Sequence, residues 1–228
     1  MRYLYLLCLL YSFCLTAQIN HWESVVLPGD QWDYLVPTSQ PSSNWNQLGF
    51  NSSSWNTGNS GFGYGDGDDA TIVSSTMSIY IRKIFTITNA SDIESIILDL
   101  DYDDGFVAYL NGQEIARNLI SGSVPAFDQA SDGWHEALLP QGYAPERFGV
   151  DSALLSTGLN VLAVQVHNQS FDSSDLSALP VLSLGINNSN TNYQTPPSWF
   201  VIPYTPVEVD FESSNLPIVL IETAQGQE

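Results

Sequence analysis

The feature that most constrains the fold is the alternation of apolar and other side chains along short runs of the chain. In SIYIRKIFTIT (78–88), one face of an extended strand would carry Ile79, Ile81, Lys83, Phe85 and Ile87. In NVLAVQVHN (160–168), one face would carry Leu162, Val164 and Val166. Successive side chains of a strand point to opposite faces, so both runs predict β-strands.

Four more segments have the composition of strands and are bounded by clusters of Gly, Asn, Asp or Ser. These segments are 95–101, 106–110, 113–118 and 179–186. No long segment has helical periodicity, and only residues 151–155 suggest a single helical turn. Short strands separated by turns predict an all-β fold, an antiparallel β-sandwich.

Residues 1–17, MRYLYLLCLLYSFCLTA, have the features of a secretory signal peptide. One Arg precedes an apolar run from Tyr3 to Leu15, and Ala17 is the small residue at the expected cleavage site. A membrane anchor is the alternative, but the run is shorter than the roughly 20 residues that span a bilayer. We expect a protein that is secreted or located at the cell surface, with no membrane insertion after cleavage.

Both cysteines, Cys8 and Cys14, lie inside this leader. The mature chain would therefore contain no disulfide, no thiolate nucleophile and no Cys-ligated metal. Small exported animal domains are often rich in disulfides, so a bacterial exported protein fits this composition better.

The net charge of −20 excludes one class of partner and favours others. Nucleic acid binding requires Lys and Arg to neutralise phosphates, and the mature chain retains only Arg82, Lys83, Arg117 and Arg147. Anionic lipid surfaces are disfavoured for the same reason. Acidity suits divalent cations and neutral ligands such as glycans. The simpler interpretation of most of the acidic residues is a solvated, soluble surface.

Composition divides the chain into segments. We assign residues 18–186 to the sandwich, 187–214 to a linker rich in Asn, Thr and Pro, and 215–228 to a final strand-like run. The long polar loops 38–60 and 121–143 contain Trp45, Trp55 and Trp134, which are not typical of disordered linkers. We expect both loops to be ordered and packed on the sandwich.

Five motifs in this order resemble a known module. They are SGFGYGDGDD (60–69), SIYIRKIFTI (78–87), YDDGFVAYLNGQEIAR (102–117), NVLAVQVHN (160–168) and SSDLSALPVLSLGI (173–186). Together they resemble the galactose-binding-like jelly-roll module that precedes the kinase-like domain of exported bacterial CotH-family proteins. The same module accompanies lamin-tail and sorting domains in surface proteins of marine bacteria. The DDG–strand–NG core is similar, more distantly, to the jelly-roll sugar-binding domain of β-galactosidases.

The resemblance covers Trp22 to Ile186 and implies a galactose-binding-domain-like jelly roll. The C-terminal LPIVLIETAQGQ (216–227) resembles the opening strand of the CotH-type domain, which implies an N-terminal fragment or a truncated product. This chain lacks the nucleotide-binding Lys, the metal-binding acidic motif and the catalytic Asp of the later parts of that family. Kinase activity is therefore carried over to no residue.

The stretch YDDGFVAYLNG (102–112) has two interpretations. Asp103-Asp104-Gly105 and Asn111-Gly112 have the chemistry of two turns that flank one strand, because Gly tolerates positive φ and Asp caps its own backbone. In the functional interpretation, Asp101, Asp103 or Asp104 lies at the sandwich rim near loops that bind calcium or glycan.

A second acidic loop contains Asp66, Asp68 and Asp69 beside two glycines. Three carboxylates on a flexible loop suit calcium, which takes about six to eight oxygen ligands. The flanking helices and the later Glu of an EF-hand are missing. The candidate calcium ligands are therefore Asp66, Asp68, Asp69, Asp103 and Asp104, and a solvated Asp-rich turn is the alternative.

The candidate ligand-binding residues are Trp134, His135, Glu136, His167, Asn168 and Asp175. Trp134 would offer a stacking platform for a sugar ring, with polar side chains around it. The His-Glu pair could bind zinc or act in acid–base catalysis, but no HExxH motif is present. A ring hydrogen bond that ties down a loop is the commoner role for such a histidine.

We find no GxSxG, no P-loop and no glycosidase carboxylate pair in a supporting context, and GFGYGDG lacks the GxGxxG spacing. The sequence therefore predicts a secreted, non-catalytic, monomeric accessory module that binds carbohydrate or another cell-surface polymer, with calcium as its candidate cofactor. The alternatives are the front end of a CotH-type protein and a structural spacer without a ligand.

Overall fold

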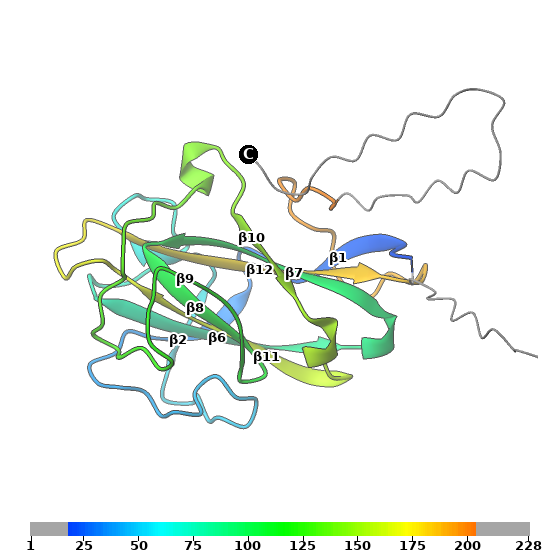
Figure 1. Ribbon diagram of the computed structural model, residues 1–228, viewed down its shortest axis with the longest axis horizontal. Coiled ribbons are helices and arrows are strands. Elements are labelled where there is room, and N and C mark those ends of the chain that lie inside the picture. Colours follow the sequence, from blue (N-terminus) through cyan, green and yellow to red (C-terminus); the bar gives the residue numbers. More distant parts are fainter. Residues whose placement is uncertain (1–17, 204–228) are drawn as a thin grey trace, which may run out of the picture.

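The computed structural model describes residues 18–203 and contains two six-stranded sheets packed face to face (Figure 1). The first sheet has the order β10 (Glu146–Val150), β7 (Ile93–Asp103), β12 (Leu176–Ile186), β4 (Phe62–Tyr64) and β5 (Thr71–Ile72), and β1 (His21–Val26) also pairs with β12. The second has the order β3 (Asn56–Asn59), β2 (Gln31–Leu35), β6 (Ser78–Ile87), β11 (Gly158–His167), β8 (Gly105–Leu110) and β9 (Gln113–Asn118). These elements confirm the predicted all-β sandwich.

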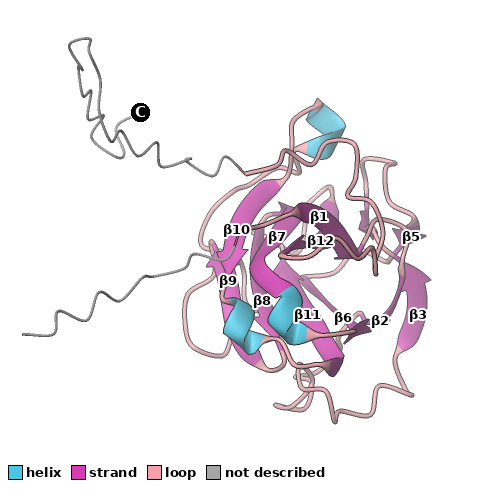
Figure 2. Cartoon of the chain, turned by 90° about the vertical axis from the view of Figure 1, so that its right-hand side faces the viewer, coloured by secondary structure: helices cyan, strands magenta, loops and turns pink. Residues whose placement is uncertain are grey.

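Most pairings are antiparallel, and the short β4–β5 contact is parallel. The helical content described is three single turns of 3-10 helix (Figure 2): η1 (Ala90–Asp92), η2 (Leu139–Gln141) and η3 (Ser152–Leu154). The turn η3 confirms the single helical turn expected at residues 151–155. Among residues 18–203, no helix is long and apolar enough to cross a membrane.

The main core lies between the two sheets and follows the alternation of the sequence. From β6 it takes Ile79, Ile81, Phe85 and Ile87, and from β11 it takes Leu162, Val164 and Val166. Strand β7 contributes Leu98, Leu100 and Tyr102, all completely buried. Burial of these alternate side chains fixes the register, because a slip by one residue would turn the apolar set toward solvent.

A second apolar cluster covers the outer face of the second sheet. It contains Trp45, Tyr80, Val107, Tyr109, Ile120 and Ala163. Arg82, which is 1% exposed, lies beneath the loop of residues 38–60. Its guanidinium donates to the carbonyls of Trp45 and Gln47, both at 3.1 Å, and to Ser52 Oγ at 2.8 Å. These contacts explain why residues 38–60 are ordered despite their polar composition.

The two turns expected around the strand 106–110 have different outcomes. Asn111 and Gly112, with φ of 52° and 83°, join β8 to β9 as a two-residue hairpin. In contrast, β7 and β8 lie in different sheets, so Asp104 is the point at which the chain crosses from one sheet to the other. Gly105 follows this crossing because a Cβ there would lie 2.8 Å from the Leu119 carbonyl oxygen.

Contacts with the sandwich continue beyond β12. The Glu23 carboxylate accepts the backbone N–H groups of Asn192 at 3.0 Å and Tyr193 at 2.7 Å, and the ring of Phe200 lies 5.5 Å from that of Trp22. The expected leader (1–17), the rest of the expected linker (204–214) and the strand-like run 215–228 lie outside the described residues.

Candidate functional site

Three carboxylates follow one another along the outer face of β7. Asp99, Asp101 and Asp103 alternate with core residues in LDLDYD, so they all point away from the core. Their exposed fractions are only 1%, 3% and 4%. Arg147 of β10 contacts Asp99, and the loop between β9 and β10 contacts Asp101. Buried carboxylates are costly unless they are paired or hydrogen-bonded, so the partners of each one are informative.

Two of the three carboxylates are satisfied by protein groups. Asp99 accepts two bonds from the Arg147 guanidinium, at 2.7 and 3.1 Å. Asp101 accepts the backbone N–H groups of Leu138 at 2.6 Å and Leu139 at 3.1 Å. Asp103 differs, because within residues 18–203 its carboxylate accepts no N–H group and its hydrogen-bond partner is the neighbouring carboxyl group of Asp104.

Asp103 faces a hollow at the end of the sandwich, together with Glu136 and Asp175. One part of the hollow, about 220 Å³, is also lined by Asp104, Trp134, Ser170, Asp172, Ser173 and Ser174. The adjoining part, about 260 Å³, is also lined by Asp66, Ala137, Pro140 and Gln141. The structure thus brings together candidate residues from four separate places in the sequence: Asp66, Asp103 with Asp104, Trp134 with Glu136, and Asp175.

The hollow concentrates negative charge. One carboxylate oxygen each of Asp103, Glu136 and Asp175 lies within 4.8 Å of the others. Burial, followed by the charges of Asp104, Asp175 and Glu136, raises the pKa of Asp103 to about 8. With protein groups alone, the protonated form of Asp103 is therefore favoured at neutral pH.

Asp104 has a different environment from its neighbour. Its Oδ1 accepts the backbone N–H of His135 at 3.0 Å, and its Oδ2 accepts the backbone N–H of Gln169 at 2.7 Å. Through these two bonds, one carboxylate of 2% exposure holds both loops that line the hollow. Asp104 therefore fixes the positions of these two loops relative to each other.

His135 anchors its loop through its ring. The imidazole stacks on Tyr102 with a centroid separation of 4.1 Å, and its Nδ1 lies 3.0 Å from the Tyr102 carbonyl oxygen. Its Nε2 lies 3.3 Å from Glu146 Oε1. These contacts place the residues on either side, Trp134 and Glu136, at the hollow.

His167 and Asn168 are completely buried at the end of β11. The Nδ1 of His167 lies 2.8 Å from the Gln129 carbonyl oxygen, and burial lowers the pKa of His167 to about 4. Asn168 Nδ2 donates to Tyr64 Oη at 2.9 Å and to the Thr76 carbonyl at 2.8 Å. Both residues connect loops to the strand, and neither lines the hollow.

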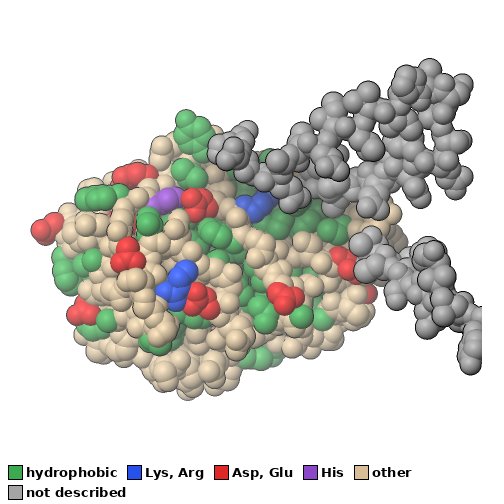
Figure 3. Space-filling view, in the orientation of Figure 1, with side chains coloured by type: hydrophobic (Ala, Val, Ile, Leu, Met, Phe, Trp, Pro, Cys, Tyr) green, Lys and Arg blue, Asp and Glu red, His purple; other side chains and the backbone are tan. Residues whose placement is uncertain are grey.

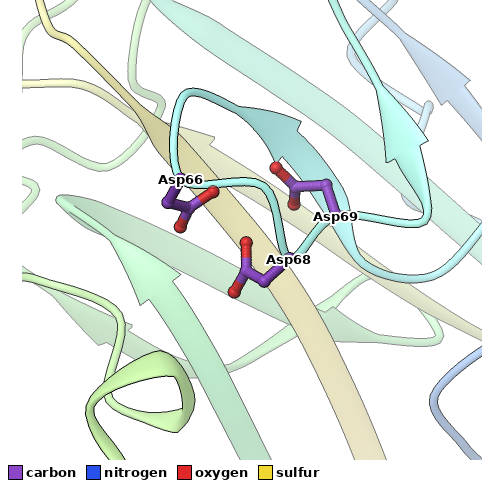
Figure 4. Close-up of side chains that lie close together, drawn as sticks. All are labelled: Asp66, Asp68 and Asp69. Atoms are coloured by element: carbon purple, nitrogen blue, oxygen red, sulfur yellow. The ribbon is translucent and has the colours of Figure 1, made fainter.

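The loop between β4 and β5 forms a second acidic cluster, in which the carboxylates of Asp66, Asp68 and Asp69 converge (Figure 4). Burial and the neighbouring carboxylates raise the pKa of Asp68 to about 6 and that of Asp69 to about 7. Asp69 packs against Gly63, where a Cβ would lie 2.6 Å from both carboxylate oxygens. Asp66 also lines the hollow, so the two clusters adjoin.

Aromatic side chains are exposed beside the carboxylates. Trp134 lines the hollow although 73% of it is exposed, and Phe171, 64% exposed, lies between Ser170 and Asp172 of the lining. Sequence reasoning missed Phe171 and Asp172, and the signal that could have found them is an aromatic residue inside the polar run SFDSSD (170–175). Elsewhere, acidic side chains are dispersed over the face shown in Figure 3.

Comparisons with known proteins show similarity of structure only. No protein-family model matches the chain, and no curated protein matches it in sequence. Solved structures with a similar arrangement include a calcium-binding mutant of Bacteroides uniformis β-glucuronidase 2 (16% identity, TM-score 0.47, 72% of this chain and 18% of that chain). An uncultured Clostridium sp. β-glucuronidase has 17% identity and a TM-score of 0.45 over 73% of this chain and 29% of that one. The chain thus spans less than a third of the length of these enzymes. The low sequence identities and TM-scores are not evidence of a shared function.

Proposed function

We propose that this chain is an exported, non-catalytic β-sandwich accessory module that binds carbohydrate in the hollow at the end of the sandwich. The observation that carries the proposal is the position of Trp134, a large aromatic side chain left 73% exposed on the lining of an acidic hollow. Exposed aromatic surface beside convergent polar groups is what a ligand site for an amphipathic molecule requires.

The chemistry of the lining suits sugar hydroxyls. An indole face packs against the C–H face of a pyranose ring, while carboxylates such as Glu136 and Asp175 accept hydrogen bonds from hydroxyl groups. Ser170, Ser173 and Ser174 add hydroxyl groups that donate or accept. Because the hollow is acidic, neutral sugars are favoured over sulfated or uronic acid residues.

The carboxylate arrangement favours binding over hydrolysis. Glycosidases generally hold two carboxyl groups about 5–9 Å apart on opposite sides of the scissile bond. In the hollow, three carboxylate oxygens converge within 4.8 Å. This convergence of three acidic side chains on one point is more typical of a polar binding site than of two carboxyl groups that face each other across a scissile bond.

The proposal extends to the cellular setting. The apolar leader supports export to the medium or the cell surface, which N-terminal sequencing of the secreted protein would test by finding Gln18 first. The resemblance to the module of CotH-family proteins supports a role beside a kinase-like domain, and the reading frame after the codon for Glu228 tests that association. Size-exclusion chromatography tests whether the protein is the expected monomer.

A glycan array tests carbohydrate binding directly. We expect the purified protein to bind a restricted set of neutral glycans, and Trp134→Ala to lose that signal. Val124→Ala is the matched control, because Val124 is 76% exposed and lies outside the lining of the hollow. Absence of binding to all glycans by the wild-type protein would favour the structural spacer instead.

A further inference from the structure

We propose that Asp103, Glu136 and Asp175 form a binding site for a divalent cation of the calcium class, with Asp103 as its buried ligand. The cation site shares Glu136 and Asp175 with the proposed carbohydrate site, but calcium binding is measured without glycan, so either proposal can fail alone. It rests on the Asp103 carboxylate, which is 4% exposed and has only another carboxyl group, that of Asp104, as its hydrogen-bond partner among the described residues. This carboxylate faces a solvent-connected hollow and lies beside two further carboxylates.

The three carboxylates along β7 differ in how their negative charges are compensated. Asp99, Asp101 and Asp103 are equally buried and lie on the same face of one strand. The first is compensated by a guanidinium and the second by two backbone N–H groups. A cation in the hollow would compensate the negative charge of Asp103, to which the described residues supply no N–H donor.

The spacing of the three carboxylates fits one calcium ion. Calcium–oxygen distances of about 2.3–2.6 Å place ligands on opposite sides of one ion at most about 5 Å apart. The three carboxylate oxygens lie within 4.8 Å of one another, so one ion can contact all of them. The hollow of about 220 Å³ beside them leaves space for water to complete the coordination.

A bound cation would also relieve the repulsion between the three carboxylates. Three carboxylates this close repel one another, and a bound cation removes that repulsion and favours their ionised forms. Only hard oxygen ligands converge here, which selects Ca²⁺ or a similar cation over zinc or copper.

The adjacent cluster of Asp66, Asp68 and Asp69 is the competing location. Its three carboxylates come from one short loop. Asp66 and Asp68 are exposed to solvent, and Oδ2 of Asp69 is buried without a hydrogen-bond partner. Asp103 is instead fixed within a strand paired to β12 and buried, so its position is set before any ion arrives. Preorganised ligands bind with a smaller entropic cost, which favours the Asp103 site.

The test is a calcium titration of the purified protein after treatment with EDTA, followed by thermal unfolding and by calorimetry. At a hundredfold excess over the dissociation constant, calcium should raise Tm by roughly 5–10 °C. Terbium, a calcium substitute, should show luminescence sensitised by excitation of Trp134 in the same hollow, and Trp134→Phe should reduce it while the calcium-induced Tm shift persists.

Variants locate the ion. Glu136→Gln and Asp175→Asn are at partly or fully exposed positions and keep side-chain shape, and each should weaken calcium binding at least tenfold. Asp128→Asn, an exposed carboxylate in the same loop as Glu136, and Asp68→Asn, in the competing cluster, should bind calcium as the wild type does. The inference is overturned if wild-type protein binds no calcium at millimolar concentration. It is also overturned if Glu136→Gln and Asp175→Asn bind normally, or if Asp68→Asn alone abolishes binding.

Discussion

Asp104 Oδ1 accepts a hydrogen bond from the backbone N–H of His135 at 3.0 Å, which joins the crossing between the two sheets to the loop that carries Trp134 and Glu136. The other oxygen of Asp104 accepts the N–H of Gln169 in the loop that carries Asp175. One buried side chain therefore sets the distance between the two walls of the hollow.

Asp104→Asn tests this relationship. The amide has one acceptor oxygen, and its NH₂ group would face a backbone N–H, so one buried bond is lost and a donor is left unpaired. We expect the free energy of unfolding to fall by about 1–3 kcal/mol. Hydrogen exchange should become faster at the amides of His135 and Gln169. Unchanged exchange at both amides would contradict the positioning role.

The pH dependence of stability tests the acidic clusters. The pKa values of Asp103 and Asp69 are raised to about 8 and about 7, whereas an unfolded Asp titrates near about 3.9. Between these pH values the folded protein retains protons that the unfolded chain has released. The free energy of unfolding should therefore fall as pH rises, by at most about 1.4 kcal/mol per pH unit for each linked proton.

His167 has the opposite effect and sets the pH range of the measurement. Its pKa is lowered to about 4, so the free energy of unfolding falls as pH drops below about 6.5. Denaturant unfolding in EDTA between pH 6.5 and 8.5 avoids this contribution. Asp103→Asn should reduce the slope there, and saturating calcium should reduce it in the wild type, because the cation competes with protons. A flat wild-type profile in EDTA would contradict raised pKa values for both Asp103 and Asp69.

Arg82→Lys tests what holds the 38–60 loop on the sheet. The guanidinium donates to three acceptors on that loop, and a lysine ammonium cannot reach them in the same geometry. We expect the free energy of unfolding to decrease by about 2–4 kcal/mol. Fluorescence should report greater exposure of Trp45, which is 5% exposed. Wild-type stability in this variant would mean that the aromatic cluster alone retains the loop.

Gly105→Ala tests the close packing after the sheet crossing. A Cβ at this position would lie 2.8 Å from the Leu119 carbonyl oxygen and 2.9 Å from Ser131 Cβ, so backbone must move. Such overpacking costs about 1–3 kcal/mol in the free energy of unfolding. Gly149→Ala is the matched control, because a Cβ there meets nothing within 4 Å, and its stability should equal or exceed that of the wild type. Equal stability of the two variants would contradict the packing described.

The sequence predicts strands with clear alternation and misses those without it. The long strands β6, β7, β11 and β12 have one mainly apolar face, so their existence follows from the period of the side chains. Strands such as β3 (NTGN) and β10 (ERFGV) are short and polar or contain Gly, so their pairing depends on tertiary contacts. For the same reason, the sequence does not distinguish a hairpin turn at Asp104 from a crossing between sheets.

The candidate site is predictable in its parts and not in its assembly. Acidic residues, Trp134 and the turn chemistry are visible in the sequence. The convergence of Asp103, Glu136 and Asp175 is not, because it arises from three segments separated by at least 33 residues and joined only by the fold. Asp104 is next to Asp103, yet the two have opposite environments, which only the hydrogen bonds reveal.

Calorimetric titration of wild-type protein and Trp134→Ala with the glycan that gives the strongest array signal tests whether the hollow is the carbohydrate site. The account predicts saturable binding by the wild type, and a loss of at least roughly tenfold in affinity for the variant at unchanged Tm. Equal affinity of the two proteins would contradict the claim that the hollow beside Trp134 is the carbohydrate site.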